Sequence, residues 1–195
     1  MGERVGVFGG TFDPVHVAHL VAAANVRHAL SLDRVLLVVA NHPWQKHDRP
    51  VSPAADRLAM VEAAAAGVDG LEASPLEIVR GGESYTADTL EALAEAHRGS
   101  ELFLVVGADV VPDLPTWRRV EVVATLATLV VVVRPGTATV DPGPRWTTER
   151  VDIPGLDVSA SDLRQRVAEG RPLDFLVPRS VIDIIARHGL YAGDR

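Results

Sequence analysis

The chain reads Gly9-Gly10-Thr11-Phe12-Asp13-Pro14-Val15-His16-Val17-Ala18-His19 immediately after the short apolar run of residues 4–8. Paired glycines at the end of a strand let the backbone come close to a bulky anion. The helix expected over residues 17–30 would direct its unpaired N–H groups and its positive dipole end at that anion. His16 and His19 are three residues apart, so both lie on one face of the first helical turn and can donate to phosphate oxygens. The stretch therefore predicts a phosphate site between a strand and a helix.

The spacing of the two glycines excludes the two commonest phosphate loops. The glycines do not follow the G-x-G-x-x-G order of dinucleotide-binding proteins, and no Gly-Lys-Ser/Thr follows them as in a P-loop. Taken alone, a Gly-Gly pair is usually a turn, and two histidines three apart are a metal half-site or an ordinary helix start. The ordered string is far more specific than any of its parts.

Apolar runs alternate with helical stretches along the rest of the chain. Strand-like runs occupy residues 4–8, 34–39, 71–78, 102–106, 128–133 and 151–153, and helical periodicity occupies residues 17–30, 52–66, 86–97, 159–169 and 178–188. The strands are solidly apolar, as expected when helices cover both faces of a sheet. The alternation predicts an α/β fold, a Rossmann-like and mostly parallel sheet with helices on both faces.

No linker, repeat or low-complexity segment interrupts this pattern, so we expect a single domain over residues 1–195. Residues 135–150, rich in Gly, Pro and Thr, are expected to form a surface loop, and Trp146 within it is expected to serve packing.

Composition excludes several classes of protein. The chain has 195 residues, with 19 Lys+Arg against 26 Asp+Glu, a net charge of −7 that argues against a nucleic-acid binder. It has no cysteine, which excludes a disulfide framework, a thiolate nucleophile and Cys-ligated metal. No apolar run reaches the roughly 18 residues of a membrane span, and no signal-peptide pattern opens the chain. We therefore expect a cytoplasmic protein without a membrane or nucleic-acid partner.

Polar and glycine-rich residues also follow the later strands. Ligands of open α/β sheets bind beyond the carboxyl ends of the strands. The segments at those ends are Asn41-His42-Pro43-Trp44-Gln45-Lys46, Gly107-Ala108-Asp109, Arg134-Pro135-Gly136 and Ser159-Ala160-Ser161, the last opening a helix that carries Arg164. We expect them to converge with the first segment at one edge of the sheet.

The string over residues 9–19 resembles the nucleotide-binding signature of the nucleotidyl transferase superfamily that carries an H-x-x-H or H-x-G-H motif. The segment Val158-Ser159-Ala160-Ser161-Asp162-Leu163-Arg164 is similar to its second signature, usually I-S-S-T-x-I-R, and departs from it at Ala160 and Ser161. Within the superfamily, four further segments resemble the bacterial nicotinate mononucleotide adenylyltransferases. They are Pro43-Trp44-Gln45-Lys46, Ser84-Tyr85-Thr86-Ala87-Asp88-Thr89-Leu90, Gly107-Ala108-Asp109 with Trp117, and Arg134-Pro135-Gly136.

This resemblance implies transfer of AMP from ATP to nicotinate mononucleotide, which gives nicotinate adenine dinucleotide and pyrophosphate in NAD biosynthesis. It implies Mg²⁺ as the cofactor that accompanies ATP, and a direct in-line attack without a covalent intermediate. The second pKa of a phosphate monoester is about 6, so the substrate phosphate is mostly a dianion at neutral pH and needs no general base.

The resemblance also assigns residues, and no metal site on the protein is among them. It implies catalytic roles for His16, His19, Lys46 and Arg164. It implies ATP binding by Gly9, Gly10, Thr11, Phe12, His16, His19, Lys46, Asp109, Arg134, Ser159, Ser161 and Arg164. It implies nicotinate mononucleotide binding by Tyr85, Thr86 and Trp117.

Three other readings stay open from the residues. A sibling enzyme could use the same loops and transfer a nucleotidyl group to another acceptor, such as nicotinamide mononucleotide or phosphopantetheine. A nucleotide-sensing module could bind without catalysis, and Asp13, His16 and His19 could instead hold a metal. The sequence also leaves the oligomeric state open, a homo-oligomer included.

Overall fold

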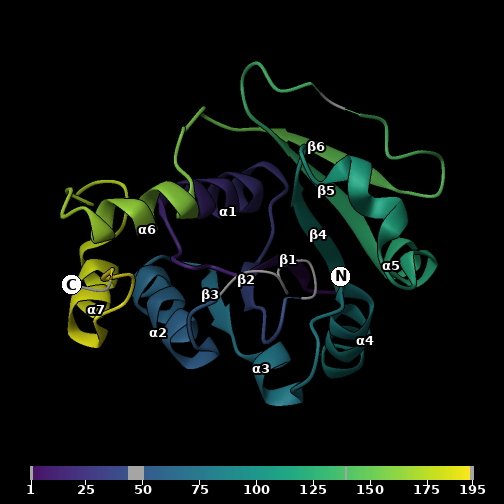
Figure 1. The fold of residues 1–195 in the computed structure, drawn as a ribbon. Helices are drawn as coiled ribbons and strands as arrows, with labels where there is room; N and C mark the ends of the chain where they lie inside the picture. The colour runs from purple at the N-terminus through teal and green to yellow at the C-terminus, as the bar shows by residue number, and fades with distance from the viewer. Residues whose placement is uncertain (1, 44–50, 139, 194–195) are drawn as a thin grey trace.

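Six strands form one parallel sheet in the order β3-β2-β1-β4-β5-β6 (Figure 1). The structure is a computed structural model that describes residues 2–43, 51–138 and 140–193. The strands are β1 (Arg4–Gly10), β2 (Arg34–Val39), β3 (Leu71–Ser74), β4 (Glu101–Gly107), β5 (Ala127–Val133) and β6 (Thr148–Asp152). Every pairing between neighbouring strands is parallel, which confirms the predicted Rossmann-like sheet.

Helices cover both faces of the sheet, as predicted. They are α1 (Val17–Ala29), α2 (Ala54–Ala65), α3 (Leu76–Arg80), α4 (Thr86–Ala96), α5 (Val120–Leu126), α6 (Ala160–Ala168) and α7 (Arg179–His188), with a 3₁₀ helix η2 at Val111–Thr116. One buried cluster joins the sheet to α1, α2, α6 and α7, and a second joins it to α4 and α5 (Figure 1). Trp146 is buried in the second cluster, which confirms its packing role. None of the helices in the described residues is long and apolar enough to cross a bilayer.

Three local expectations are corrected by the structure. The strand expected over residues 71–78 ends at Ser74, and α3 begins after Pro75, whose ring fits a helix start better than a ladder. Residues 148–150 of the expected loop belong to β6, an edge strand whose side chains are mostly exposed and so carry little apolar signal. Helices α3 and α5 and the η2 turn were not expected, because each is too short to show a helical period.

The sheet reverses its strand order between β1 and β4. From β1 the chain proceeds outward through β2 to β3, and from β4 it proceeds outward through β5 to β6. The loops after two such neighbouring strands leave in opposite directions, which opens a crevice at their carboxyl ends. Gly10 ends β1 and Gly107 ends β4, so both glycines lie at this switch point.

Arg57 is a fully buried arginine on the apolar face of α2, only 1% exposed. Its guanidinium donates to the carbonyl oxygens of Ser52 at 2.8 Å, Thr11 at 2.9 Å, Ala40 at 2.6 Å and Asn41 at 3.0 Å. The four bonds tie the loop after β1, the loop after β2 and the start of α2 to one side chain. Burial lowers the pKa of Arg57, and the nearby Asp13 opposes that shift.

Asp13 connects the loop after β1 to the C-terminal segment. Its buried carboxylate accepts from the Tyr191 hydroxyl at 2.6 Å and from the Ser52 N–H at 3.3 Å. Burial and the bond to Asp13 raise the pKa of Tyr191 well above its usual range, so the hydroxyl stays protonated and donates. The backbone carbonyl of Asp13 accepts from Arg164 at 2.7 Å. Segments far apart in sequence therefore hold one short loop in place.

We expect Arg57→Met to keep the volume of the side-chain stem but lower the free energy of unfolding by about 3 kcal/mol or more. The reason is that several carbonyl oxygens lose a buried donor, at about 1–3 kcal/mol each. Urea denaturation measures the effect, and Arg187→Met, at an exposed position of α7, is the control with a change within about 0.5 kcal/mol. Equal midpoints for the two variants would contradict this role of Arg57.

Candidate active site

A first cavity, which we call the phosphate cavity, gathers most of the residues expected to bind ATP. Its lining includes Gly10, Thr11, Phe12, His16, His19, Asp109, Arg134, Ser159, Ser161 and Arg164. Of the other expected ATP residues, Gly9 lines the neighbouring cavity, and Lys46 lies outside the described residues. Segments from both ends of the chain thus meet at the carboxyl edge of the sheet, as the strand-end pattern predicted.

His16 and His19 stack on each other at the start of α1, with ring centroids 3.7 Å apart. The backbone N–H of His16 donates to Nδ1 of His19 at 3.2 Å. A ring nitrogen that accepts carries no proton, so in His19 the proton lies on Nε2. The ring of Phe12 packs edge-on against His19 at 5.0 Å. His19 is therefore oriented with Nε2–H as its donor, and both rings line the phosphate cavity.

His16 is buried, with 6% of its surface exposed. Burial lowers the pKa of His16 to about 4, because the interior disfavours the charged imidazolium. Nδ1 of His16 is buried without a hydrogen-bond partner among the described residues. At neutral pH His16 is thus an uncharged imidazole, which can offer one N–H to a bound anion without adding charge to the cavity.

The start of α6 brings the second signature into the phosphate cavity. The Ser159 hydroxyl caps the helix by accepting from the Asp162 N–H at 3.2 Å. Arg164 donates to the Ser161 hydroxyl at 3.3 Å and to the carbonyl of Asp13 at 2.7 Å. This guanidinium therefore links the two signature segments, which lie at opposite ends of the chain.

Gly9 and Gly10 have different reasons to be glycine. A Cβ on Gly10 would come within 2.8 Å of the Phe12 ring, so the packing under His19 requires a glycine there. A Cβ on Gly9 would meet no atom within 4 Å, because that position opens onto the second cavity. Close packing requires the second glycine, whereas the first leaves room for a ligand.

A second cavity, which we call the acceptor cavity, lies on the other side of Gly10. Its lining includes Gly9, Thr11, Pro43, Glu77, Ser84, Thr86, Thr89 and Trp117. The two cavities share Phe8, Gly10, Thr11, Gly107 and Val110. They therefore meet at the switch point between β1 and β4, where groups bound in each could come into contact.

The acceptor cavity has one aromatic wall and one helical wall. Trp117 follows η2 with its indole Nε1 buried and unpartnered within the described part of the chain, while its backbone N–H donates to Leu114 at 3.1 Å. Thr86 opens α4, and the first N–H groups of a helix have no intrahelical partner. Tyr85 is not among the residues that line this cavity; Arg118 lies over its ring at 4.6 Å.

Sequence reasoning missed three residues that support the site. Arg57 could have been found, because it occupies an apolar position of α2 together with Met60, Val61 and Ala64. Tyr191 and Glu77 gave no such signal. Glu77 is buried in the acceptor cavity wall, where it accepts from the Thr89 hydroxyl at 2.5 Å.

Comparison with known proteins places the chain in a family. The sequence profile described as cytidylyltransferase-like matches residues 7–166. A relative from Corynebacterium kroppenstedtii, named "Probable nicotinate-nucleotide adenylyltransferase", is 43% identical over 96% of this chain and 90% of its own. A Roseiflexus relative of the same name is 45% identical over 96% of this chain and 97% of its own. The chain belongs to the nicotinate-nucleotide adenylyltransferase family.

Solved structures of similar fold carry related names. The chain matches the Plasmodium falciparum nicotinic acid mononucleotide adenylyltransferase complexed with NaAD, with a TM-score of 0.80 over 98% of each chain. The same enzyme complexed with APC matches with a TM-score of 0.77. Their sequence identities of 18% and 17% show a shared fold.

The buried His16 predicts a pH dependence of stability in this member of the family. Its pKa falls from 6.5 in the unfolded chain to about 4 in the folded one, so between these values the unfolded chain binds more protons. Stability contributed by neutral His16 is therefore complete above pH 6.5 and is lost as the pH falls toward 4. From pH 7 to pH 5 the loss is about 2 kcal/mol.

The measurement is urea denaturation of the wild type and of His16→Asn at both pH values. We expect the loss between pH 7 and pH 5 to be smaller in the variant by about 2 kcal/mol. The same loss in both proteins would show that His16 does not carry this dependence.

Proposed function

We propose that the chain transfers the adenylyl group of ATP to the phosphate of nicotinate mononucleotide, releasing pyrophosphate and forming nicotinate adenine dinucleotide. The observation that carries the proposal is the meeting of two cavities at Gly10 and Thr11. One holds the paired histidines and Arg164, and the other holds an aromatic wall and a helix N-terminus. Membership of the adenylyltransferase family supports the same substrates.

In this reaction an oxygen of the acceptor phosphate forms a bond to the α-phosphorus of ATP, and the bond from that phosphorus to the β-phosphate oxygen breaks. The acceptor phosphate is already mostly ionised at neutral pH, so no proton has to be removed. The protein contributes alignment of the two phosphates and stabilisation of charge on the transferring phosphorus and the leaving group.

We assign the largest share of that stabilisation to Nε2–H of His19, because its orientation is fixed before ATP binds. His16 adds a neutral donor, and Arg164 adds a positive charge held between Asp13 and Ser161. Lys46, outside the described residues, is proposed to neutralise part of the triphosphate.

The remaining residues expected to bind ATP contact the nucleotide in this proposal. Backbone donors of Gly9, Gly10, Thr11 and Phe12 surround the phosphates. Asp109 binds a ribose hydroxyl, Arg134 contacts the nucleotide from the loop after β5, and Ser159 and Ser161 contact it from the start of α6.

Magnesium enters this mechanism as part of the substrate MgATP. No group of three or more His, Asp or Glu side chains within the described ranges is arranged to hold a metal ion. Both carboxylate oxygens of Asp13 already accept hydrogen bonds from the protein. Mg²⁺ binds readily to substrate phosphates and water, which suits a site whose own groups are imidazole and guanidinium donors.

In the acceptor cavity, Trp117 stacks on the pyridine ring, and the first-turn N–H groups of α4, beginning at Thr86, bind its carboxylate. Tyr85 contributes through its contact with Arg118. An amide in place of the carboxylate would turn an NH₂ group toward a buried donor, at a cost of about 1–3 kcal/mol. One such mismatch gives a preference of roughly 5- to 150-fold for the acid substrate.

A cytoplasmic location and the formation of a homo-oligomer stay predictions.

The function is tested by pyrophosphate release from MgATP with nicotinate mononucleotide, nicotinamide mononucleotide and phosphopantetheine as rival acceptors. We expect the highest kcat/KM with nicotinate mononucleotide. A higher value with either rival would reassign the enzyme to that acceptor. ATP binding without release from any of them would indicate a nucleotide-sensing module instead.

We expect His19→Ala to lower kcat by about 100- to 1,000-fold while changing the Kd for ATP far less, because it removes one preorganised donor to a developing charge. Steady-state kinetics and calorimetric ATP titration measure the two quantities. A folded variant with full turnover would exclude the mechanism.

We expect Trp117→Ala to raise KM for nicotinate mononucleotide and leave KM for ATP nearly unchanged, because the indole faces only the acceptor cavity. Both constants are measured on the same preparation. An equal rise in both would mean that Trp117 supports the fold rather than the ring of the acceptor.

A further inference from the structure

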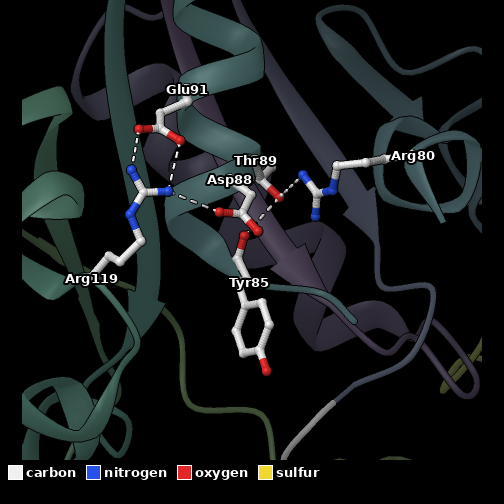
Figure 2. Close-up of polar contacts among 6 residues, drawn as sticks. All are labelled: Arg80, Tyr85, Asp88, Thr89, Glu91 and Arg119. Carbon is white, nitrogen blue, oxygen red and sulfur yellow. Dashed lines mark hydrogen bonds and ion pairs between the residues drawn. The ribbon is translucent and has the colours of Figure 1, made fainter. Parts of the chain in front are cut away.

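Two consecutive arginines tie the segment that carries Trp117 to helix α4. Arg119 donates from Nη1 to Asp88 at 3.1 Å and to Glu91 at 2.9 Å, and from Nη2 to the second oxygen of Glu91 at 2.5 Å. Arg118 places its guanidinium 4.6 Å from the ring centre of Tyr85, which precedes α4. Figure 2 shows Arg119 reaching across to two acidic side chains on one face of the helix.

The backbone of Arg119 adopts an uncommon conformation at this contact. Arg119 has φ 57° and ψ 41°, the left-handed region that a side chain with a Cβ rarely adopts. Such a conformation is unfavourable for a residue with a Cβ and persists only where the surroundings hold it. The carbonyl oxygen of Arg119 accepts from the N–H groups of Val122 and Val123 at 2.9 and 3.3 Å, which places this residue at the start of α5. Its side-chain bonds to Glu91 and Asp88 connect that start to α4.

The contact joins the two segments that form opposite walls of the acceptor cavity, the one that carries Trp117 and helix α4. Trp117 lies one residue before the arginine pair, and Thr86 and Thr89 lie on the helix that the arginines contact. Thr89 is fixed from the other side, because its hydroxyl accepts from Arg80 at 3.2 Å (Figure 2). The same hydroxyl also donates to Glu77. Helix α4 is thus the fixed wall, and the Trp117 segment is the wall that the arginines place.

We propose that Arg119 is a positioning residue that sets the gap between Trp117 and the first turn of α4, and thereby the affinity for a pyridine mononucleotide acceptor. The proposal rests on the proposed function, since it concerns the acceptor of that reaction. Arg119 is not among the described residues that line the two cavities, so it acts through Trp117 rather than on substrate.

The expected effect is on substrate affinity rather than on stability. The side chains of Arg119, Asp88 and Glu91 are 40%, 34% and 44% exposed, and exposed ion pairs add little to stability. Stacking requires the ring and the indole at van der Waals distance, and a well-placed aromatic pair contributes about 2- to 13-fold in affinity beyond its buried area. We therefore expect KM for nicotinate mononucleotide to rise about tenfold in Arg119→Ala, with small changes in KM for ATP and in Tm.

The experiment compares Arg119→Ala, Glu91→Gln and the exchanged pair Glu91→Arg/Arg119→Glu with wild type. Arg179→Ala is the matched control, because Arg179 makes an exposed ion pair with Asp183 on α7. We expect both single variants to raise KM for the acceptor, the exchanged pair to recover part of the loss, and the control to match wild type. Direct titration of the acceptor by calorimetry should show the same order of affinities.

An unchanged acceptor KM in Arg119→Ala would overturn the proposal, as would an equal rise in KM for ATP, which would indicate a general structural role. Wild type is assayed first with the three rival acceptors. If another acceptor is preferred, the proposed function fails while the positioning role is tested with the KM for that acceptor. The two failures are therefore distinguishable.

Discussion

The buried guanidinium of Arg57 is the interaction on which the rest of the site depends. Loops after parallel strands have no ladder to hold them, and their carbonyl oxygens must find donors. Arg57 supplies those donors to Thr11, Ala40 and Asn41 from a single planar group. Because a guanidinium stays charged and its donors have fixed directions, it can fix the relative positions of two loops where a flexible lysine could not. Thr11, which lines both cavities, is therefore held in place by a buried donor.

The paired histidines have different properties because they differ in burial. His16 is enclosed and its pKa is lowered, so it adds hydrogen-bonding capacity without charge. His19 is less buried, lies against Phe12 and is oriented by the backbone of His16. Among the described residues, the cavity obtains its positive charge instead from Arg134 and Arg164, and Arg164 is anchored to the carbonyl of Asp13. Positive charge thus comes from a group that cannot lose its proton near neutral pH, and the imidazoles supply direction.

The parts of this site that sequence could predict are those that short continuous segments carry. The end of β1 with its two glycines and the start of α1 follow one another and predicted the phosphate site, while the alternation of strands and helices predicted the fold class and the edge where the loops meet. Arg57 and Tyr191 could not be placed in the same way, because their partners Thr11 and Asp13 lie 46 and 178 residues away. The start of β6 and the short α5 escaped for another reason, since residues 148–150 are exposed and α5 has only seven residues.

Different kinds of interaction hold the phosphate half and the acceptor half of the site. Buried hydrogen bonds hold the phosphate half, where an unpaired group would cost about 1–3 kcal/mol, so its geometry is stiff. The wall that bears Trp117 depends on partly exposed ion pairs, which solvent and salt weaken. This difference matches what each half has to do. Charge that develops during phosphoryl transfer is stabilised by donors already in place, whereas the ring of the acceptor needs only a wall at van der Waals distance, which partly exposed ion pairs are enough to position.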